Sequence, residues 1–480
     1  MTAVAPPSSD GTISDPKQLR RGVLGLPEVL MQSITTVAPA IGILFTLPFI
    51  ASYAGVASPL GYLLSFLLVL ALALNVSQLA RHLPNAGGFF TYISHAVHPR
   101  IGWLSGWIMV LYMPAATFTS PIFLCFLLEQ EIAASALSAE IPWWLIFLAI
   151  TSLVLVLMYR GITISAKALL LLGLAEIAVV LLLALWGIAD PGPGGLNLES
   201  FDPANTTAHG LWFAVVFSVF ALTGWESAAP LAEETAEPRR NVPRALVGSV
   251  LLMGVLFTVC AWGLTVGWGT DDVDGLVASE TLPAFVLAKD AWGALWWAVP
   301  LALLNSAIAV SIASMNVSTR MWFSMARAGA LPQVLTRLHP RHRTPVGALA
   351  LQAAITLGIG LVLGAWWEGS DLFFVSGLLF TLAASWLYVW ANVGVVLFYR
   401  RERRSEFHPL PHVVLPVLTT VALAYVCWQT FTNPAPEGRG AWALPIFLVW
   451  AGVGVAILAL MRTRGREGWL LRAGEEVHER

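Results

Sequence analysis

The chain's fold is decided by the stretch VFSVFALTGWESAAPLAEETAEPRRNVP, residues 216–243. It begins as an apolar helix and then places Thr223, Gly224 and Glu226 where a helix inside a bilayer should stay apolar. A charged residue within a membrane helix is costly, and it indicates a functional site by default. The neighbouring glycine predicts local unwinding, which is tolerated at membrane depth only where the backbone is buried in protein or lines a cavity. The stretch therefore predicts an interrupted membrane helix.

The composition indicates a membrane protein. Of the 480 residues, 57% are hydrophobic and 11% are charged, whereas about a quarter of the residues of a soluble domain are charged. The three cysteines fall in apolar segments without a CxxC or metal-binding spacing, so we expect no disulfide. The first 26 residues are polar and lack the apolar core of a signal peptide, so we expect them to form a disordered cytoplasmic tail.

Recurring apolar runs predict an all-α polytopic membrane protein with twelve transmembrane helices, each able to cross about 30 Å of hydrocarbon. This arrangement puts both termini on one side of the membrane. All but two of the 26 lysines and arginines fall on that side, the exceptions being Lys289 and Arg439, so we expect it to be the cytoplasm. The predicted spans are residues 28–53, 58–81, 100–130, 142–159, 166–188, 209–232, 243–268, 293–326, 346–366, 371–399, 411–431 and 441–462.

Two spans carry interruptions at corresponding places. The first span contains SITTVAPAIGI, residues 33–43, in which Pro39 predicts a break near residues 38–42 because proline removes a backbone donor. The sixth span, which runs in the opposite direction, is interrupted near residues 220–226. The third and eighth spans are both long, and each follows a short amphipathic stretch. Such pairing indicates inverted repeats with a binding site at their interface near the midplane.

The repeats imply a domain organisation in five parts. We expect a disordered cytoplasmic tail (1–26), a first inverted repeat of five spans (27–190) and a second of five spans (206–400). The last two spans (409–463) would be peripheral additions, followed by a cytoplasmic tail (464–480). A lone proline kink is more often structural than functional, but two matching breaks with polar neighbours favour a binding site.

The chain resembles the permeases of the amino acid–polyamine–organocation (APC) superfamily. The resemblance is carried by GWESAAPLAEETAEPRRNVPRAL (224–246), by ASMNVSTRMWFSMARAGALP (313–332) and by LPNAGGFFTYI (83–93), which lie at matching topological positions. It implies a LeuT-like fold, with a 5+5 inverted repeat plus two C-terminal helices. The usual first-span signature, Gly-Ser/Ala-Gly-Ile-Phe, is replaced by Ala-Pro-Ala-Ile-Gly at residues 38–42, which resembles a bacterial branch and leaves the substrate open.

A bound amino acid would need donors for its carboxylate and acceptors for its ammonium. We expect the free N–H groups of Ala40, Ile41 and Gly42, just past the first break, to bind the carboxylate. The carbonyls of Phe220, Ala221 and Leu222, before the second break, are expected to bind the ammonium. By resemblance, Phe220 matches a family aromatic that closes over the substrate; core or lipid packing is the alternative. The predicted substrate-binding residues are Thr35, Thr36, Ala38, Ala40, Ile41 and Gly42 at the first break, Met113 and Ala116 in the third span, and Phe220, Ala221, Leu222 and Thr223 before the second break.

Two carboxylates in apolar spans are candidates for coupling. Glu176 lies in the fifth span, where many family members by resemblance carry a lysine in place of a coupling sodium. Desolvation favours the neutral form of a carboxyl group, so Glu176 is the first candidate proton carrier, with a structural tie to the first or eighth span as the alternative. Glu226 is expected either to carry the proton or to anchor the second break. Ser314 and Ser318 would complete a sodium site with first-span backbone, or only bond helices together.

The leading interpretation is a secondary active transporter of an amino acid or related amine, coupled to protons, and not an enzyme. A sodium-coupled symporter and an amino acid or amine antiporter are alternatives on the same fold, and a channel or transporter-like sensor is an alternative of another class. The sequence carries neither an intramembrane His/Asp or His/Glu cluster nor a Walker motif.

The expected partners are a small-molecule amino acid or amine and the lipid bilayer of the cytoplasmic membrane, without nucleic acid, for a monomer or homodimer. No cofactor and no metal site are expected beyond the coupling H⁺ or Na⁺. We expect some charged residues on the cytoplasmic side to form ion pairs that act as an inner gate or as bracing, with the pairings left open. The candidates are Glu233, Glu234, Arg239, Arg240, Arg320 and Arg327.

Overall fold

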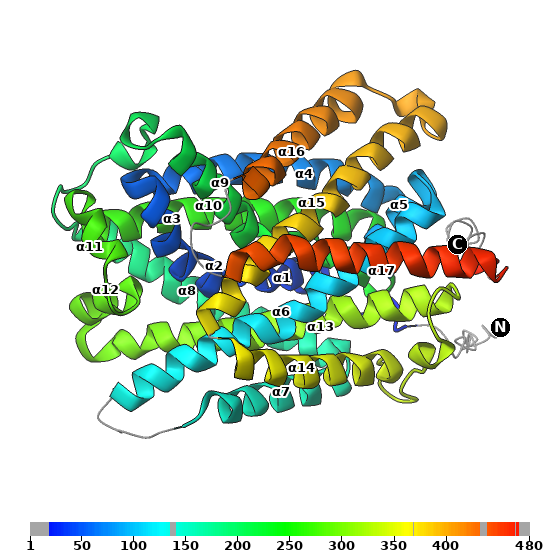
Figure 1. The fold of residues 1–480 in the computed structure, drawn as a ribbon, viewed down its shortest axis with the longest axis horizontal. Helices are drawn as coiled ribbons and strands as arrows, with labels where there is room; N and C mark the ends of the chain where they lie inside the picture. Colours follow the sequence, from blue (N-terminus) through cyan, green and yellow to red (C-terminus); the bar gives the residue numbers. More distant parts are fainter. Residues whose placement is uncertain (1–18, 135–140, 368, 433–438, 466, 470–480) are drawn as a thin grey trace, which may run out of the picture.

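A computed structural model of the chain describes residues 19–134, 141–367, 369–432, 439–465 and 467–469, and these residues are arranged as a bundle of helices (Figure 1). In this described part, 11 helices are long and apolar enough to cross a membrane. The shorter apolar helix α7 (Trp143–Tyr159) has 17 residues and occupies the fourth predicted span. The structure confirms the all-α membrane class, whereas the count of twelve spans stays a prediction.

The helices follow the predicted spans in order. The first half consists of α1 (Leu26–Val37), α2 (Pro39–Leu44) and α3 (Thr46–Ala54), then α4 (Ser58–His82), α5 (Phe89–Ala96), α6 (Pro99–Ala134), α7 and α8 (Ile162–Ala189). The second half consists of α9 (Ala208–Leu222), the 3₁₀ segment η4 (Trp225–Glu234), α10 (Pro238–Trp268), α11 (Val273–Val277), α12 (Pro283–Trp292), α13 (Ala298–Arg327), α14 (Val346–Trp366) and α15 (Gly369–Arg401). Helices α16 (Leu415–Thr432) and α17 (Ala443–Thr463) follow, and a short described segment continues to residue 469.

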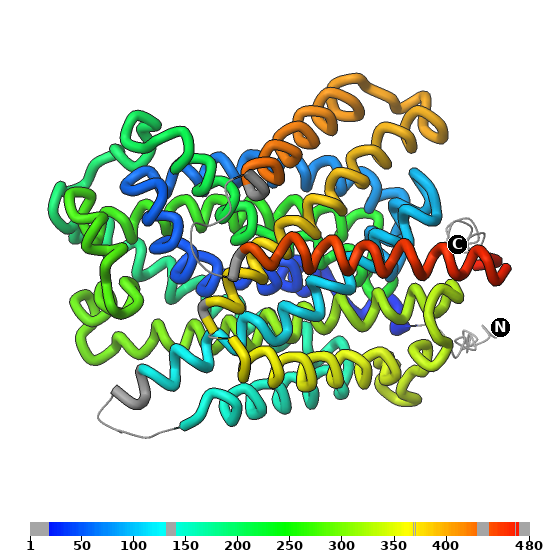
Figure 2. Tube along the Cα trace, in the orientation of Figure 1, coloured from blue at the N-terminus to red at the C-terminus, as the bar shows by residue number. Residues whose placement is uncertain are grey.

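The first span breaks at Ala38, as Pro39 predicts. Ala38 adopts φ 56° and ψ 74°, a left-handed conformation that costs a non-glycine residue about 1–2 kcal/mol. Pro39 then starts α2, where its fixed φ suits the first helical position. The break lies near the centre of the molecule, where the trace of α1 turns into α2 (Figures 1 and 2).

The sixth span breaks at Thr223 and Gly224. Thr223 is extended, with φ −66° and ψ 140°, and Gly224 adopts φ 116°, which glycine reaches without steric cost. The chain continues as η4, ten residues of 3₁₀ helix, which is long for this geometry and typical of a strained or functional segment.

The two breaks lie directly against each other. A Cβ atom added to Gly224 would lie 2.9 Å from the carbonyl carbon and oxygen of Thr36. Next to this contact, the Ser33 hydroxyl donates to the Trp225 carbonyl oxygen at 2.6 Å and accepts from the Ala228 N–H at 3.2 Å. Helix α1 and η4 are therefore bonded into one unit beside the breaks.

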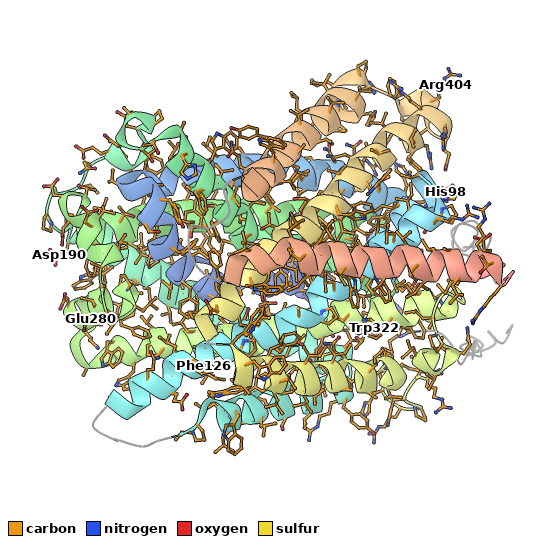
Figure 3. The ribbon with its side chains drawn as sticks, in the orientation of Figure 1. His98, Phe126, Asp190, Glu280, Trp322 and Arg404 are labelled. Carbon is orange, nitrogen blue, oxygen red and sulfur yellow. The ribbon has the colours of Figure 1, made fainter. Side chains whose placement is uncertain are left out.

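The bundle has two ends, and each carries loops with charged residues. Figure 3 shows Arg404 and His98 at one end and Asp190 and Glu280 at the other. At the first end, which we call the basic end, Arg100 Nη2 and Glu467 Oε1 are 2.9 Å apart. Large apolar side chains that project outward between the two ends include Leu171 on α8 and Val449 on α17, which are 71% and 67% exposed. Such exposure is what a lipid-facing surface requires.

Residues 19–25 differ from the disordered tail expected for residues 1–26. Leu19 and Leu24 are buried, and the N–H groups of Val23 and Leu24 donate to the Glu234 carbonyl oxygen at 2.9 and 3.1 Å. This segment is folded onto the basic end because its leucines find apolar partners there. The remainder of the predicted tail, residues 1–18, lies outside the described residues.

Candidate functional site

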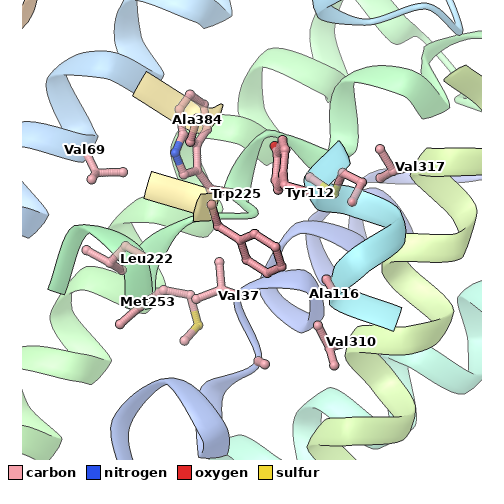
Figure 4. Close-up of a cluster of buried hydrophobic side chains, with 14 of the residues drawn as sticks. Val37, Val69, Tyr112, Ala116, Leu222, Trp225, Met253, Val310, Val317 and Ala384 are labelled. Atoms are coloured by element: carbon pink, nitrogen blue, oxygen red, sulfur yellow. The ribbon is translucent and has the colours of Figure 1, made fainter. Parts of the chain in front are cut away.

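A cavity of about 50 Å³ lies between the two helix breaks. One water molecule needs roughly 10–15 Å³ of such space, so the cavity accommodates a few waters or a small solute. Its walls come from α1, α2, α3, α6, α9, α13 and α15. Figure 4 shows Val37, Tyr112, Ala116 and Val310, four of its lining residues, around the first break.

Most of the predicted substrate-binding residues meet at this cavity. The lining includes Thr36, Ala38, Ile41, Gly42, Met113, Ala116, Phe220, Ala221 and Thr223. The other three do not line it: Thr35, Ala40 and Leu222 are buried behind the breaks. The Thr35 hydroxyl instead donates to the Met31 carbonyl oxygen at 2.6 Å, within its own helix.

The N–H groups after the first break are less available than the sequence analysis expects. Ala40 N–H donates to Glu176 Oε1 at 2.7 Å, and Gly42 N–H donates to the Ala38 carbonyl oxygen at 2.7 Å. Ile41 N–H lies 3.5 Å from the Ser306 hydroxyl, which is a weak contact. The expectation of three free donors is therefore corrected: two are occupied within the chain, because buried N–H groups seldom stay unpaired.

Glu176 reaches the first break from α8. Its Oε1 accepts from Ala40 N–H and, at 2.6 Å, from the Ser306 hydroxyl on α13, so it connects the first, fifth and eighth spans. The side chain is fully buried, and Oε2 has no hydrogen-bond partner among the described residues. Glu176 does not line the cavity but lies immediately behind its wall.

Glu226 holds the second break in the same way. Its Oε2 accepts from Gly224 N–H at 3.1 Å and from the Tyr388 hydroxyl at 2.9 Å, and its Oε1 accepts from the Tyr112 hydroxyl. The carboxylate is fully buried. The bond to Gly224 is the one that the helix-anchor interpretation predicts, while proton transfer by Glu226 stays a prediction.

Aromatic rings close one side of the cavity. Phe220 lies 5.7 Å from Phe373 in an edge-to-face contact and 6.2 Å from Phe380. All three rings line the cavity, so the position of Phe220 is compatible with an aromatic that covers a bound solute.

The two serines of the predicted ion site differ in orientation. Ser314 lines the cavity, and its hydroxyl has no hydrogen-bond partner among the described residues. The Ser318 hydroxyl donates to the Ser314 carbonyl oxygen at 2.7 Å, within α13. A sodium site here would need further oxygens from the backbone, and it stays a prediction.

Two ion pairs lie between the cavity and the basic end. Arg320 Nε and Glu234 Oε2 are 2.5 Å apart, with side chains 2% and 3% exposed. Arg327 and Glu233 form a bidentate pair at 2.5 and 3.0 Å. The structure thus pairs four of the six charged residues from which the sequence analysis expects an inner gate or bracing, whereas Arg240 pairs with the exposed Glu237.

Several cavity residues were not predicted. Val310, Phe373 and Phe380 lie within long helices, where ordinary apolar or aromatic residues carry no sequence signal of their own. Tyr112 and Ser120 could have been found, because each is a polar residue in a membrane span and Tyr112 also precedes the predicted Met113.

The comparisons with known proteins agree with this geometry. A family model described as "Amino acid permease" matches residues 28–461. The chain is 23% identical over 411 residues to the low-affinity putrescine importer PlaP of Escherichia coli, covering 84% of this chain and 85% of that protein. It is 24% identical over 425 residues to the branched-chain amino acid permease BcaP of Lactococcus lactis, covering 80% and 85%.

Another relative is the L-methionine/branched-chain amino acid exporter YjeH of Escherichia coli, 29% identical over 281 residues, covering 58% of this chain and 63% of that protein. These relatives include an importer and an exporter, so they do not fix a direction of transport. The family match spans most of the chain and includes both breaks. The chain belongs to the amino acid permease family of the APC superfamily, a family of multi-pass membrane transporters.

Proposed function

We propose that this protein carries an amino acid or related amine across the cytoplasmic membrane by alternating access, with the cavity between the two breaks as the substrate site. The observation that carries the proposal is the direct contact of the breaks at Thr36 and Gly224 beside a small cavity. The Thr36 hydroxyl, the Ile41 N–H and the carbonyl groups at the end of α9 are the groups that would hold the substrate. Interrupted helices offer such backbone groups at membrane depth.

A neutral amino acid fits the cavity better than a polyamine. The described lining contains no carboxylate side chain, and its walls are mostly apolar or aromatic. A diamine brings two ammonium groups, which need acceptors or anions at both ends. A neutral amino acid presents one carboxylate and one ammonium to the breaks and an apolar side chain to the walls.

The coupling ion in this proposal is a proton, and Glu176 carries it. Its carboxylate binds the N–H group of Ala40, so its protonation state acts on the backbone of the first break. Sodium symport through Ser314 and antiport without a coupling ion are the competing mechanisms. The proposal also places the basic end in the cytoplasm, because positively charged loops stay on that side of a membrane. It retains the predicted 5+5 inverted repeat, whose two halves would move against each other around the cavity.

The experiment has two stages. A thermal-shift screen of the purified protein across amino acids and amines identifies the ligand, and uptake of that ligand into proteoliposomes is then measured under an imposed pH or sodium gradient. The proposal expects stabilisation by a neutral amino acid and accumulation driven by the pH gradient. Accumulation driven only by a sodium gradient would mean that the coupling ion is sodium and not a proton. If no amino acid or amine is taken up under any gradient, the proposed function is overturned.

A further inference from the structure

Gln32 joins three elements at the centre of the molecule. Its side-chain Nε2 donates to the Ala313 carbonyl oxygen on α13 at 2.8 Å, and its Oε1 accepts from Asn316 Nδ2 at 3.1 Å. Its backbone carbonyl oxygen accepts from the Thr36 hydroxyl at 2.7 Å and from the Ser227 hydroxyl of η4 at 3.2 Å. Gln32 is 1% exposed, so these polar groups depend on one another.

The contacts continue from Gln32 to the buried ion pair. Asn316 Oδ1 accepts from Arg320 Nη1 at 3.2 Å, and Arg320 Nε donates to Glu234 Oε2 at 2.5 Å. In the other direction, Thr36 lines the cavity. Hydrogen bonds, joined through the covalent structure of Gln32 and Asn316, therefore connect the cavity-lining Thr36 to the ion pair on the side of the basic end.

Several contacts of this chain would break together if α1 and η4 moved away from α13. Helix α1 and η4 are bonded together by Ser33 and by the 2.8 Å contact between the Thr36 and Ser227 hydroxyls. Moving this unit away from α13 breaks both side-chain bonds of Gln32 at once, since its donor and its acceptor face the same helix. It also separates Glu234 from Arg320, and an unpaired buried charge is strongly unfavourable.

We propose that Gln32 is a positioning residue that makes opening of the Arg320–Glu234 ion pair depend on the occupancy of the cavity. A solute that bonds to the Thr36 hydroxyl competes with the Gln32 carbonyl oxygen for its proton and so loosens the first link of the chain. The proposal rests on the transport function proposed above and adds the route by which the substrate acts on the inner ion pair.

A single-cysteine reporter tests the route. Ser318→Cys is placed in a protein whose Cys125, Cys260 and Cys427 are replaced by serine; Ser318 lies one helical turn from the cavity-lining Ser314, on the side of Arg320. A membrane-impermeant maleimide is added to inside-out vesicles with and without the ligand from the thermal-shift screen. With Gln32 intact, labelling is expected to be slow without ligand and faster with ligand, because the ligand loosens the first link of the chain.

Gln32→Met keeps the volume and removes both side-chain bonds to α13. Labelling without ligand is expected to rise about tenfold, the change that roughly two intramembrane hydrogen bonds account for, and to become independent of ligand. Gln352→Met is the matched control, because Gln352 is also buried and bonds Thr117 at 3.2 Å but lies outside the chain of contacts. This control should label like the parent.

A second variant guards against simple misfolding. Asn316→Leu removes one of the two Gln32 links from the α13 side and leaves the bond to Ala313, so it should raise labelling in the same direction but by less. The double variant should label no faster than Gln32→Met alone. Parent-like, ligand-dependent labelling of Gln32→Met, or equal acceleration by Gln352→Met, would overturn the proposal. If no ligand affects the parent or is transported, the proposed function fails, whereas the labelling rates without ligand still report on Gln32.

Discussion

The Glu176 carboxylate accepts a hydrogen bond from the Ala40 backbone N–H at 2.7 Å, on the far side of the proline break. The second break has a matching relationship, since Glu226 accepts from the Gly224 N–H at 3.1 Å. Each broken helix therefore has a buried carboxylate that binds an N–H group released by the break. The two differ in their other partners: Glu226 also binds two tyrosine hydroxyls, whereas Glu176 keeps one oxygen without a partner among the described residues.

This difference predicts that Glu176→Gln uncouples transport without destroying the site. The glutamine oxygen still accepts from Ala40 N–H and the Ser306 hydroxyl, but the amide does not take up a proton. Accumulation driven by a pH gradient should fall to the equilibrium level, while ligand binding and counterflow persist. Proteoliposome uptake with and without the gradient measures both, and unchanged proton-driven accumulation would exclude Glu176 as the proton carrier.

Gly224→Ala should damage the contact between the breaks. The new Cβ would lie 2.9 Å from Thr36 backbone atoms at φ 116°, where strain alone costs about 1–3 kcal/mol. Ligand-induced thermal stabilisation should disappear, and the apparent melting temperature should fall. Gly358→Ala on α14 is the control, because its added Cβ meets no described residue within 4 Å beyond its chain neighbours and its own helix backbone. Equal effects of the two substitutions would argue against a specific role for the contact.

Glu226→Ala should be among the most destabilising single changes in the bundle. It leaves Gly224 N–H and the hydroxyls of Tyr112 and Tyr388 without their acceptor, and each unpaired buried donor costs roughly 1–3 kcal/mol. Tyr388→Phe removes one bond and should cost about 1 kcal/mol. Thermal unfolding of the two variants should show this order; the reverse order would mean that Glu226 does not anchor the break.

The buried pair Arg320–Glu234 predicts a non-additive result. Either Arg320→Met or Glu234→Met alone leaves an unpaired buried charge and should cost roughly 3–5 kcal/mol, whereas the double substitution should cost less than either. The exposed pair Arg240–Glu237 is the comparison, and its removal should not measurably change stability. Additive losses at Arg320 and Glu234 in thermal unfolding would contradict the pairing.

The sequence predicted the breaks because their causes are local. Pro39 removes a donor within one turn, and Gly224 permits a backbone angle that other residues avoid, so both positions can be identified without tertiary information. Glu176 and Glu226 could also be identified from the sequence as candidate functional residues, because desolvation makes a charged residue in an apolar span costly.

The partners of these residues could not be predicted. Tyr112 and Tyr388 are 114 and 162 positions from Glu226, and Ala40 is 136 positions from Glu176. Which side chains of a long helix face the cavity depends on helix rotation, which is set by packing of the whole bundle. The local sequence also does not reveal that a carboxylate from another span accepts the Ala40 N–H, and so the expectation of a free donor there is wrong.

The central claim is that the substrate occupies the cavity between the breaks, and filling that cavity tests it most directly. Ala116→Phe places a ring in the space of about 50 Å³ without changing either break, and Ala459→Phe on the exposed side of α17 adds the same ring elsewhere. For variants that remain folded and monodisperse, the measurement is the affinity for the ligand found in the screen. The account predicts that Ala116→Phe abolishes binding while Ala459→Phe leaves it unchanged; unchanged affinity in folded Ala116→Phe protein would contradict it.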